Sequence, residues 1–449
     1  RGFFAALALA EGGVNVVLLE RGEAVEARGR DIGALMARRV LNPESNLCYG
    51  EGGAGTWSDG KLTTRIGKNT TGVRRVMESL VEFGAPERIL MMSKPHLGTD
   101  RLVMILRAFR ARLVELGVEV RFGARVEDVI VEGGRAVGVE LEGGESIRAD
   151  HTVLAVGHSA RILFERLQAN GVAMTQKEFA LGFRVEHPQD LIDTINYGRL
   201  ASGVERGKGK VPVADYRVAA DGQKCWSFCM CPGGQVVCTS TTEDELCVNG
   251  MSFSKRASPW ANSALVTPVG PGDFAPWAAE HGALAGMEMQ REAERRAAEM
   301  GGGAFVAPVQ RVTDFLEGRP STGELPKSSY RLGVRAGMLD ELYPPAQIAA
   351  MRAALVQFER SLPGFLSADG LLHGVETRTS SPVRIDRGDN YESVSTPGLY
   401  PLGEGAGYAG GIMSAALDGL LAGEAMVARM TGAEPSRGAA GTRADRGMY

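Results

Sequence analysis

The sequence lacks the patterns by which metal-binding and disulfide-rich proteins are recognised. Its 449 residues include only six cysteines, and no two of them have a Cys-x-x-Cys spacing. A chain of this length can bury a core without disulfide bonds. The cysteines therefore indicate a reducing compartment and no metal site.

Long apolar runs and an excess of positive charge are also missing. No run of 18 or more apolar residues is present, so no membrane span is expected. The net charge is −4 and the pI is near 6.0, which gives no basic surface for nucleic acid. These absences leave a small-molecule substrate as the expected partner.

Glycine, in contrast, is abundant, with 60 residues that gather in short groups. Gly133-Gly134 and Gly143-Gly144 lie between alternating apolar runs and predict hairpin turns. Gly52-Gly53 and Gly410-Gly411 do not lie between such runs. They suit backbone that approaches a ligand closely.

The first 22 residues read as the second half of a dinucleotide-binding βαβ unit. An apolar helix over 2–11 predicts a buried element, and the apolar run 14–19 predicts a strand of a parallel sheet. Gly2 fits the third glycine of a G-x-G-x-x-G turn, and Glu20 fits the acid that binds the ribose. The alternative is an ordinary α/β unit with an acid at a strand end. Since no opening strand or earlier glycines precede Gly2, we expect an N-terminal truncation that weakens the diphosphate site.

The segment 46–62 is too rich in glycine for a regular element. It offers small side chains, backbone N–H groups and Lys61, which suit a flat ring and a diphosphate. The alternative is a flexible surface loop, which the embedded Tyr49, Trp57 and Leu62 disfavour.

The middle of the chain changes character near residue 175. Before it we expect two helices, the second capped by Thr99 or Asp100, a β-meander, and a buried strand that ends at Gly157 and His158. The ranges are 72–92 and 101–116 for the helices, 118–122, 125–131 and 136–141 for the meander, and 150–156 for the strand. Beyond it, short strands over 179–186, 226–231 and 236–240 and helices over 286–300 and 346–361 predict an inserted α+β domain.

The last informative block is 398–419. A strand ends at Gly403, Glu404 follows, and a helix begins near Gly411 after a glycine-dense turn. The N-terminus of that helix directs N–H groups and positive charge at a cleft. Residues after 430 are small and polar and predict a disordered tail.

Several long motifs resemble the FAD-dependent dehydrogenases often called NAD(FAD)-utilizing dehydrogenases, which have plastid relatives in plants and algae. The motifs are GEGGAGTWSDGKL, KPHLGTDRL, LAVGHSAR, SFCMCPGG, NGMSFS, LHGVETRTSSPVR and YPLGEGAGYAGGIMSAALDG. The resemblance runs from Gly2 to about Met426 and is closest to the plant and algal members. It implies FAD as the cofactor and a chloroplast location, with the cytoplasm as the alternative.

The resemblance also implies a fold and a set of cofactor-binding residues. The fold is α/β, a Rossmann-like FAD/NAD(P)-binding domain over 1–66, 98–170 and 371–430, with a helical insertion at 67–97, a substrate domain over 171–370 and a tail over 431–449. The residues implied to bind FAD are Gly2, Glu20, Arg21, Gly52, Gly53, Ser58, Lys61, Val126, Gly157, Gly403, Glu404, Gly410, Gly411 and Ile412.

The substrate side is less defined. In such enzymes hydride passes to or from flavin N5, and NAD(P)H is a candidate transient reductant. Arg378 could clamp a carboxylate and His373 could move a proton, or both could belong to an inter-domain salt-bridge cluster. Cys229 and Cys231 are either a redox pair near the flavin or two small buried hydrophobes.

Three functions follow from these observations. The first is an FAD-dependent oxidoreductase acting on a small organic substrate. The others are a flavin-dependent tRNA-modifying protein and a non-catalytic flavin-binding scaffold. The acidic balance of the chain disfavours the tRNA function.

Overall fold

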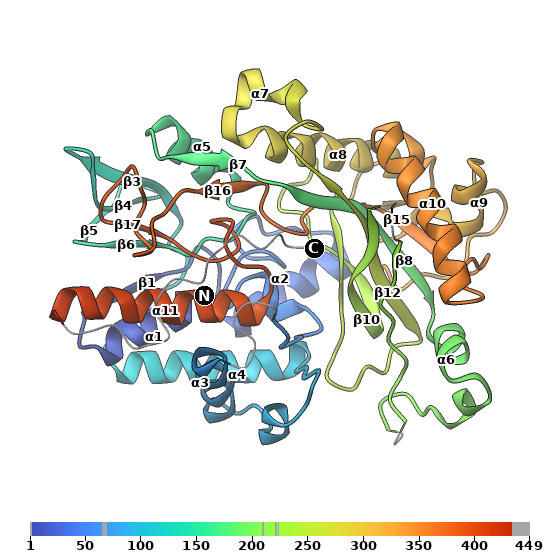
Figure 1. Cartoon of the computed structure of the whole chain (residues 1–449), viewed down its shortest axis with the longest axis horizontal. Helices are drawn as coiled ribbons and strands as arrows, with labels where there is room; N and C mark the ends of the chain where they lie inside the picture. Colours follow the sequence, from blue (N-terminus) through green and yellow to red (C-terminus); the bar gives the residue numbers. More distant parts are fainter. Residues whose placement is uncertain (1, 65–69, 209–210, 221, 223, 433–449) are drawn as a thin grey trace.

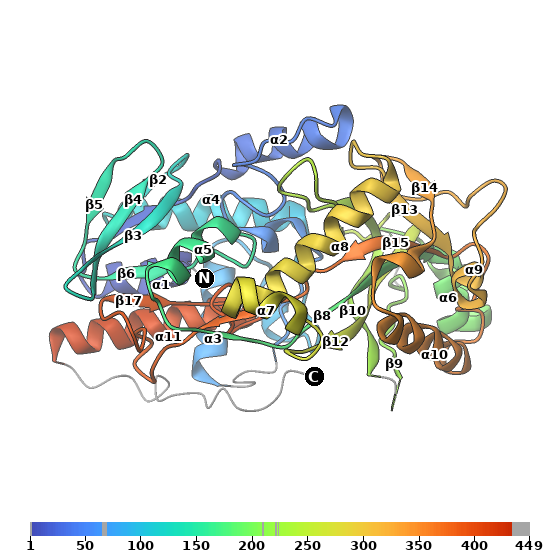
Figure 2. The same cartoon turned by 90° about the horizontal axis from the view of Figure 1, so that it is seen from above.

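The computed structural model describes residues 2–64, 70–208, 211–220, 222 and 224–432. They form two lobes, one with the N-terminal helices and one around a large sheet (Figures 1 and 2). Residues 433–449 of the expected tail lie outside the described residues. The fold is mixed α/β, as predicted.

The first lobe contains two pairs of parallel strands that are distant in the sequence. β1 (Val17–Leu19) pairs with β2 (Glu119–Arg121), and β6 (Thr152–Leu154) pairs with β17 (Leu399–Pro401). Parallel pairing needs crossover connections, and here it joins the beginning, middle and end of the chain. This lobe is therefore assembled from segments that are distant in the sequence.

Helices α1 (Gly2–Glu11) and α11 (Ile412–Thr431) lie side by side against these strands (Figure 1). Small residues allow the contact: a Cβ on Gly423 would lie 2.8 Å from the Cβ of Ala8. Phe4 to Leu9 are all buried, so the prediction of a buried first helix is confirmed.

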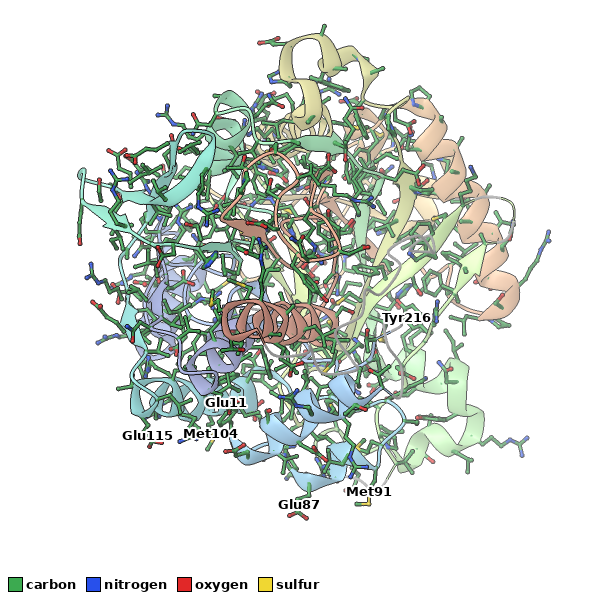
Figure 3. The ribbon with its side chains drawn as sticks, turned by 60° about the vertical axis from the view of Figure 1, so that its left-hand side comes forward. Glu11, Glu87, Met91, Met104, Glu115 and Tyr216 are labelled. Carbon is green, nitrogen blue, oxygen red and sulfur yellow. The ribbon has the colours of Figure 1, made fainter. Side chains whose placement is uncertain are left out.

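A helical layer covers the opposite side of α1. α4 (Thr99–Glu115) places Phe109 edge-on to Phe3 and Phe4 and stacked on Phe83, with ring centroids 4.3–5.2 Å apart. The N-cap of α4 is Gly98, whereas Thr99 or Asp100 was expected. Figure 3 shows Met104 and Glu115 of α4 at the outer edge of the molecule.

The predicted helix over 72–92 is shorter in the structure. α3 (Thr71–Glu82) is followed by a separate turn, η2 (Glu87–Leu90). Gly84 has a φ of +102° and Pro86 lacks an N–H donor, so the segment between them does not continue an α-helix.

The β-meander also differs from its prediction. It consists of β3 (Val126–Glu132), β4 (Arg135–Leu141) and β5 (Ser146–Arg148), with turns at the two expected glycine pairs. The predicted first strand of the meander is β2, which instead pairs with β1. The sequence of β2 carries no signal for which neighbour it chooses.

The second lobe is built on an eight-stranded sheet with the order β11-β10-β12-β8-β15-β13-β14, and β9 pairs with β10. Two predicted strands, 226–231 and 236–240, are one bulged strand, β10. The strand bounds are Phe179–Pro188 (β8), Ala219–Ala220 (β9), Cys225–Cys238 (β10), Val248–Met251 (β11), Trp260–Val269 (β12), Ala307–Arg311 (β13), Val334–Ala336 (β14) and Leu371–Glu376 (β15).

Helices pack around this sheet, chiefly α8 (Ala285–Gly301) and α10 (Pro345–Ser361). Both were predicted to within one residue. The shorter elements are α6 (Gln189–Tyr197), η3 (Gly198–Gly203), α7 (Ala275–His281), η4 (Gly282–Leu284), α9 (Val312–Glu317) and η5 (Leu339–Leu342).

Residues 371–376, the start of the last predicted FAD-binding segment, form β15. β15 hydrogen-bonds to β8 and β13 in the large sheet of the second lobe. The lobes are also joined by β7 (Met174–Gln176), which pairs with β16 (Val383–Ile385). α2 (Val25–Arg38) packs Ile32 and Leu35 into the core of the second lobe.

No helix within the described ranges is long and apolar enough to cross a membrane.

Candidate functional site

A cavity of about 1150 Å³ extends through the first lobe to the face of the second. Ligand sites commonly measure about 300–1,000 Å³, so this one accommodates a dinucleotide-sized molecule. All residues of β1 and β6 line it, and these two strands do not pair with each other in the described part of the chain. Glu20 and Gly411, which are 391 positions apart in the sequence, share this cavity.

Glu20 stands at the end of β1, where its carboxylate organises the neighbouring loops. Its Oε1 accepts hydrogen bonds from the backbone N–H groups of Gly22 at 2.9 Å and Gly50 at 3.0 Å. Arg21 pairs with Glu44 at 2.8 Å and lies over the Tyr49 ring. An acid held at a strand end in this way is the group that a ribose diol requires.

The glycine-rich loop lies against the cavity and is ordered. Gly52 and Gly53 have φ values of +81° and +67° and precede η1 (Ala54–Trp57). A Cβ on Gly52 would lie 2.2 Å from Thr56 Oγ1, whereas a Cβ on Gly53 would meet nothing within 4 Å. Ser58 accepts from Gly60 N at 3.1 Å, so its hydroxyl supports the turn. The loop therefore presents small residues and backbone to the cavity.

Two other backbone segments cross at the cavity wall. A Cβ on Gly405 would lie 2.5 Å from the Gly157 carbonyl oxygen, so the loops after β6 and β17 touch through glycine. Gly157 has a φ of +74°, and its missing side chain faces open space. Glu404 lines the same cavity.

The last wall of the cavity is the N-terminus of α11. Gly411, with a φ of +80°, is the N-cap, and Ile412 begins the helix as predicted. The first N–H groups of a helix lack intrahelical partners and carry partial positive charge. They favour an anionic or electron-rich group at this end of the cavity.

The arrangement fits a flavin dinucleotide. Gly53, Gly157 and Gly411 form a cradle, since each has a positive φ and a Cβ at each would project into open space. Three buried polar atoms of the lining, Trp57 Nε1, His151 Nδ1 and Thr152 Oγ1, have no hydrogen-bond partner in the described part of the chain. Buried polar groups of this kind are satisfied by a ligand or by water.

Twelve of the fourteen residues implied to bind FAD line the cavity, and two do not. Gly403 and Gly410 lie outside the lining. The N–H of Gly403 donates to Asp418 at 2.6 Å, so this residue shapes the turn before α11. The twelve are Gly2, Glu20, Arg21, Gly52, Gly53, Ser58, Lys61, Val126, Gly157, Glu404, Gly411 and Ile412.

Arg378 reaches the cavity, but its guanidinium is engaged in a buried ion cluster. It donates to Glu294 at 2.6–2.9 Å and to Glu245 at 3.1 Å, while Arg161 binds the same two carboxylates. The surrounding burial opposes ionisation of Glu294, yet the two arginines hold its pKa far below the usual range. Since Arg161 begins α5 (Arg161–Ala169) and Glu294 lies in α8, this is the inter-domain salt-bridge cluster that was the alternative.

His373 lies within β15, away from the cavity lining. Its side chain is fully buried, with Nε2 2.8 Å from Ser328 Oγ and Nδ1 3.2 Å from the Arg184 carbonyl oxygen. Both ring nitrogens thus have protein partners, and the pKa of His373 is lowered by burial. This placement does not bring the imidazole to a substrate.

The cavity wall includes residues that the sequence did not single out. Phe228, Asn249 and Thr379 reach it from the second lobe. Asn249 lies in the NGMSFS motif and Thr379 follows Arg378, so the motifs marked the segments without indicating which side chain faces the cavity.

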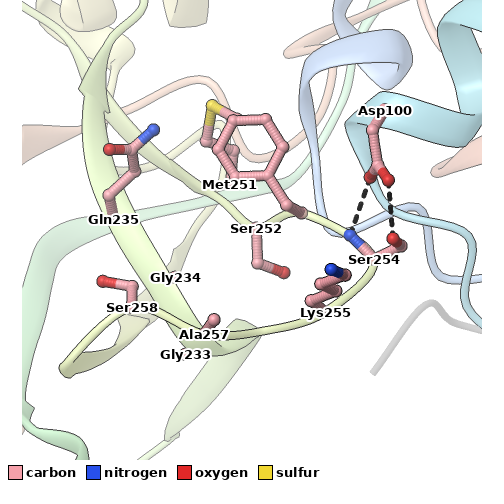
Figure 4. Close-up of a pocket in the computed structure, with 11 residues that line it drawn as sticks. Asp100, Gly233, Gly234, Gln235, Met251, Ser252, Ser254, Lys255, Ala257 and Ser258 are labelled. Carbon is pink, nitrogen blue, oxygen red and sulfur yellow. Dashed lines mark hydrogen bonds between the residues drawn. The ribbon is translucent and has the colours of Figure 1, made fainter. Parts of the chain in front are cut away.

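A second, smaller cavity of about 260 Å³ lies between α4 and the loop after β11 (Figure 4). Asp100 accepts hydrogen bonds from the backbone N–H and the hydroxyl of Ser254 at 2.7 and 2.6 Å. These bonds join the two lobes. In the described ranges, no group of three or more His, Cys, Asp or Glu side chains is arranged to hold a metal ion.

The fold and the cavity define the chain as a dinucleotide-binding α/β protein, and comparisons with known families agree. Residues 178–379 match the family model described as FAD-dependent protein, C-terminal domain-like. Residues 102–223 match the model described as FAD dependent oxidoreductase. The first match begins just before β8 and ends just after β15.

An uncharacterized protein of Clostridium beijerinckii is 41% identical over 432 residues, covering 95% of this chain and 79% of that protein. The chain belongs to the family of that protein, which the two models identify as FAD-dependent oxidoreductases. Its cofactor is FAD. A shorter segment of 49 residues is 47% identical to hydroxyneurosporene desaturase of Rubrivivax gelatinosus, covering 11% of this chain and 9% of that protein.

Solved structures of flavoproteins are similar at a lower level. The flavin-dependent brominase Bmp2 has a TM-score of 0.38 and 14% identity, covering 97% of this chain and 78% of its own. CtdE in complex with FAD has a TM-score of 0.36 and 12% identity, covering 94% and 80%. The family assignment rests on the sequence relative and the family models.

Proposed function

We propose that this protein transfers a hydride between a small organic substrate and the flavin, with NAD(P)H as its source of electrons. The observation that carries the proposal is the shared cavity of Glu20, Gly53, Gly157 and Gly411. When bound, FAD supplies the two-electron chemistry, and the protein supplies orientation and electrostatics.

The residues of the cavity divide into three roles. Glu20 would accept hydrogen bonds from the ribose hydroxyls. The backbone at Gly53 and Gly157 would lie along the cofactor, and Lys61 places a cation on the same wall. The N-terminus of α11 at Gly411 would stabilise negative charge on the reduced ring.

The substrate would enter where the two lobes meet. Phe228, Asn249 and Thr379 of the second lobe face the first across the cavity. They offer an aromatic ring, an amide and a hydroxyl, which suit an organic substrate with a polar group. Arg378 stiffens this wall through its ion cluster, and we assign His373 no contact with the substrate.

Anaerobic mixing with NADH and NADPH tests the proposal. The purified chain is first incubated with excess FAD so that the cofactor site is filled. Bleaching of the bound flavin at a rate that saturates with nucleotide concentration is the expected result. FAD that binds but is bleached by neither nucleotide would favour the scaffold function.

The same purified protein can be assayed for bound RNA, which tests the alternative tRNA-modifying function. Co-purified RNA whose modification depends on FAD would replace the present proposal. The chloroplast location stays a prediction from the resemblance, and imaging of the tagged protein in plant or algal cells would test it.

A further inference from the structure

Two cysteines stand in a polar cluster at the wall of the FAD cavity. Cys229 is half-buried and lines the cavity, whereas Cys231 is fully buried behind it. Neither is required for the roles assigned above. We call Cys229, Cys231, Lys61 and Arg184 the thiol cluster.

A β-bulge brings the two cysteines together. Phe228 pairs with Ala264 and Cys231 pairs with Asn262, so β10 has one residue more than β12 between these positions. Cys229 takes up the difference with a φ of +48°. In a regular strand, residues two apart are separated by about 6.6 Å. That lies at the upper end of the Cα separations of about 4.4–6.8 Å found in disulfides.

Buried hydrogen bonds hold this geometry. Arg184, which is fully buried, donates to the Cys229 carbonyl oxygen at 2.7 Å and to Cys231 Sγ at 3.4 Å. A Cβ on Gly250 would lie 2.1 Å from Arg184 Nη2, so glycine there leaves room for the guanidinium. Lys61 donates to the Met230 carbonyl oxygen between the two cysteines.

The charges around the cluster favour a thiolate at Cys229. The Cys231 thiol donates to the Cys229 carbonyl oxygen at 3.4 Å. The Cys231 side chain, Lys61 and Arg184 together lower the pKa of the Cys229 thiol. Asp59 and Glu376 face the cluster with the opposite charge and are paired to Lys61 and Arg184 at 3.1 and 3.0 Å. In contrast, burial raises the pKa of Cys225, Cys238 and Cys247.

We propose that Cys229 and Cys231 form a dithiol–disulfide pair that exchanges two electrons with the bound flavin. In the forward direction the Cys229 thiolate and the Cys231 thiol form one S–S bond and release two electrons and one proton. Both electrons and the proton pass to oxidised FAD, which becomes the two-electron-reduced anion. The pair rests on FAD occupying the cavity, but not on NAD(P)H being the reductant.

Counting electrons tests the pair without a substrate. The FAD-loaded protein is oxidised and then titrated anaerobically with dithionite. Wild-type protein is expected to take up four electrons per FAD, two for the flavin and two for the disulfide. Cys229→Ser and Cys231→Ser should each take up two, whereas Cys48→Ser, which removes another thiol of the same cavity wall, should still take up four. Uptake of two electrons by wild-type protein would overturn the proposal.

A second measurement stands if either serine variant fails to fold. Wild-type protein is equilibrated with buffers of varied oxidised-to-reduced dithiothreitol ratio, alkylated and digested. As the ratio rises, the peptide that carries Cys229 and Cys231 should change from the form with both thiols alkylated to a disulfide form. The disulfide form carries no alkyl group on either sulfur and is two hydrogens lighter than the free dithiol. If both thiols remain alkylated at every ratio, they are small buried side chains and the pair does not exist.

The two experiments also separate this proposal from the preceding one. Four-electron uptake with no bleaching by NADH or NADPH would sustain the pair and remove the nicotinamide reductant. Two-electron uptake with rapid bleaching would overturn the cysteine pair and support the nicotinamide reductant.

Discussion

Replacing Gly157 by alanine should weaken FAD binding in addition to straining the backbone. Its φ is +74°, where an L-residue costs about 1–2 kcal/mol. An added Cβ would meet no protein atom within 4 Å, so no clash adds to that cost. The methyl group would instead enter the cavity that holds the cofactor.

Gly134 provides a matched control. It has a φ of +78°, its Cβ would also meet nothing within 4 Å, and it lies in the exposed β3–β4 turn outside the cavity lining. Gly134→Ala should therefore carry the same backbone cost without touching FAD. The difference between the two variants isolates the ligand contact.

The expected magnitude follows from mass action. A ligand present at 100 times its Kd stabilises the native state by about 2.7 kcal/mol. We expect Gly157→Ala to weaken binding about tenfold, which lowers that gain to about 1.4 kcal/mol at the same FAD concentration. Denaturant unfolding of each variant with and without FAD measures the gain. Equal gains for Gly157→Ala and Gly134→Ala would refute the cradle.

Three further predictions concern the α11 N-terminus, the buried ion cluster and a buried histidine. Gly411→Asp should lower the flavin reduction potential, while the neutral Gly411→Asn should change it little. Dye-coupled redox titration compares the two variants. Equal potentials would show that the N-terminus of α11 does not lie near the flavin. Glu294→Gln should destabilise the protein by about 3–5 kcal/mol in urea unfolding, because Arg161 and Arg378 lose their shared charge, and a loss below 1 kcal/mol would contradict the cluster's role. Burial lowers the pKa of His187 to about 4, below its unfolded value near 6.5, so the unfolded state binds more protons and stability falls as the pH drops from 6.5 to 4. The decrease attributable to His187 is on the order of 3 kcal/mol. It should disappear in His187→Gln, and parallel pH curves for the two proteins would refute it.

Much of the cofactor side was predictable because short-range rules govern it. The helix at 2–11 was buried as its all-round apolar surface required. Glycine pairs at 133–134 and 143–144 formed hairpin turns because glycine adopts positive φ without strain. Motif spacing placed Glu20, Gly53, Gly157 and Gly411 at element ends, and all four line one cavity.

The sequence was least informative where a distant partner decides the outcome. The sequence of β15 is compatible with a strand in either lobe. Only its hydrogen bonds to β8 and β13 assign it to the second lobe. His373 and Arg378 lie five residues apart in one polar segment. His373 is buried and hydrogen-bonds to Ser328, whereas Arg378 is paired with Glu294 of α8.

By itself, the sequence determined the local conformations and the positions of the glycines and acids that a dinucleotide requires, because these depend on the backbone preferences of single residues and their neighbours. Only the tertiary structure decided which side chains meet. The Cys229–Cys231 pair depends on a bulge in β10, an arginine from β8 and a lysine from the glycine loop, and no local pattern encodes contacts between segments so far apart.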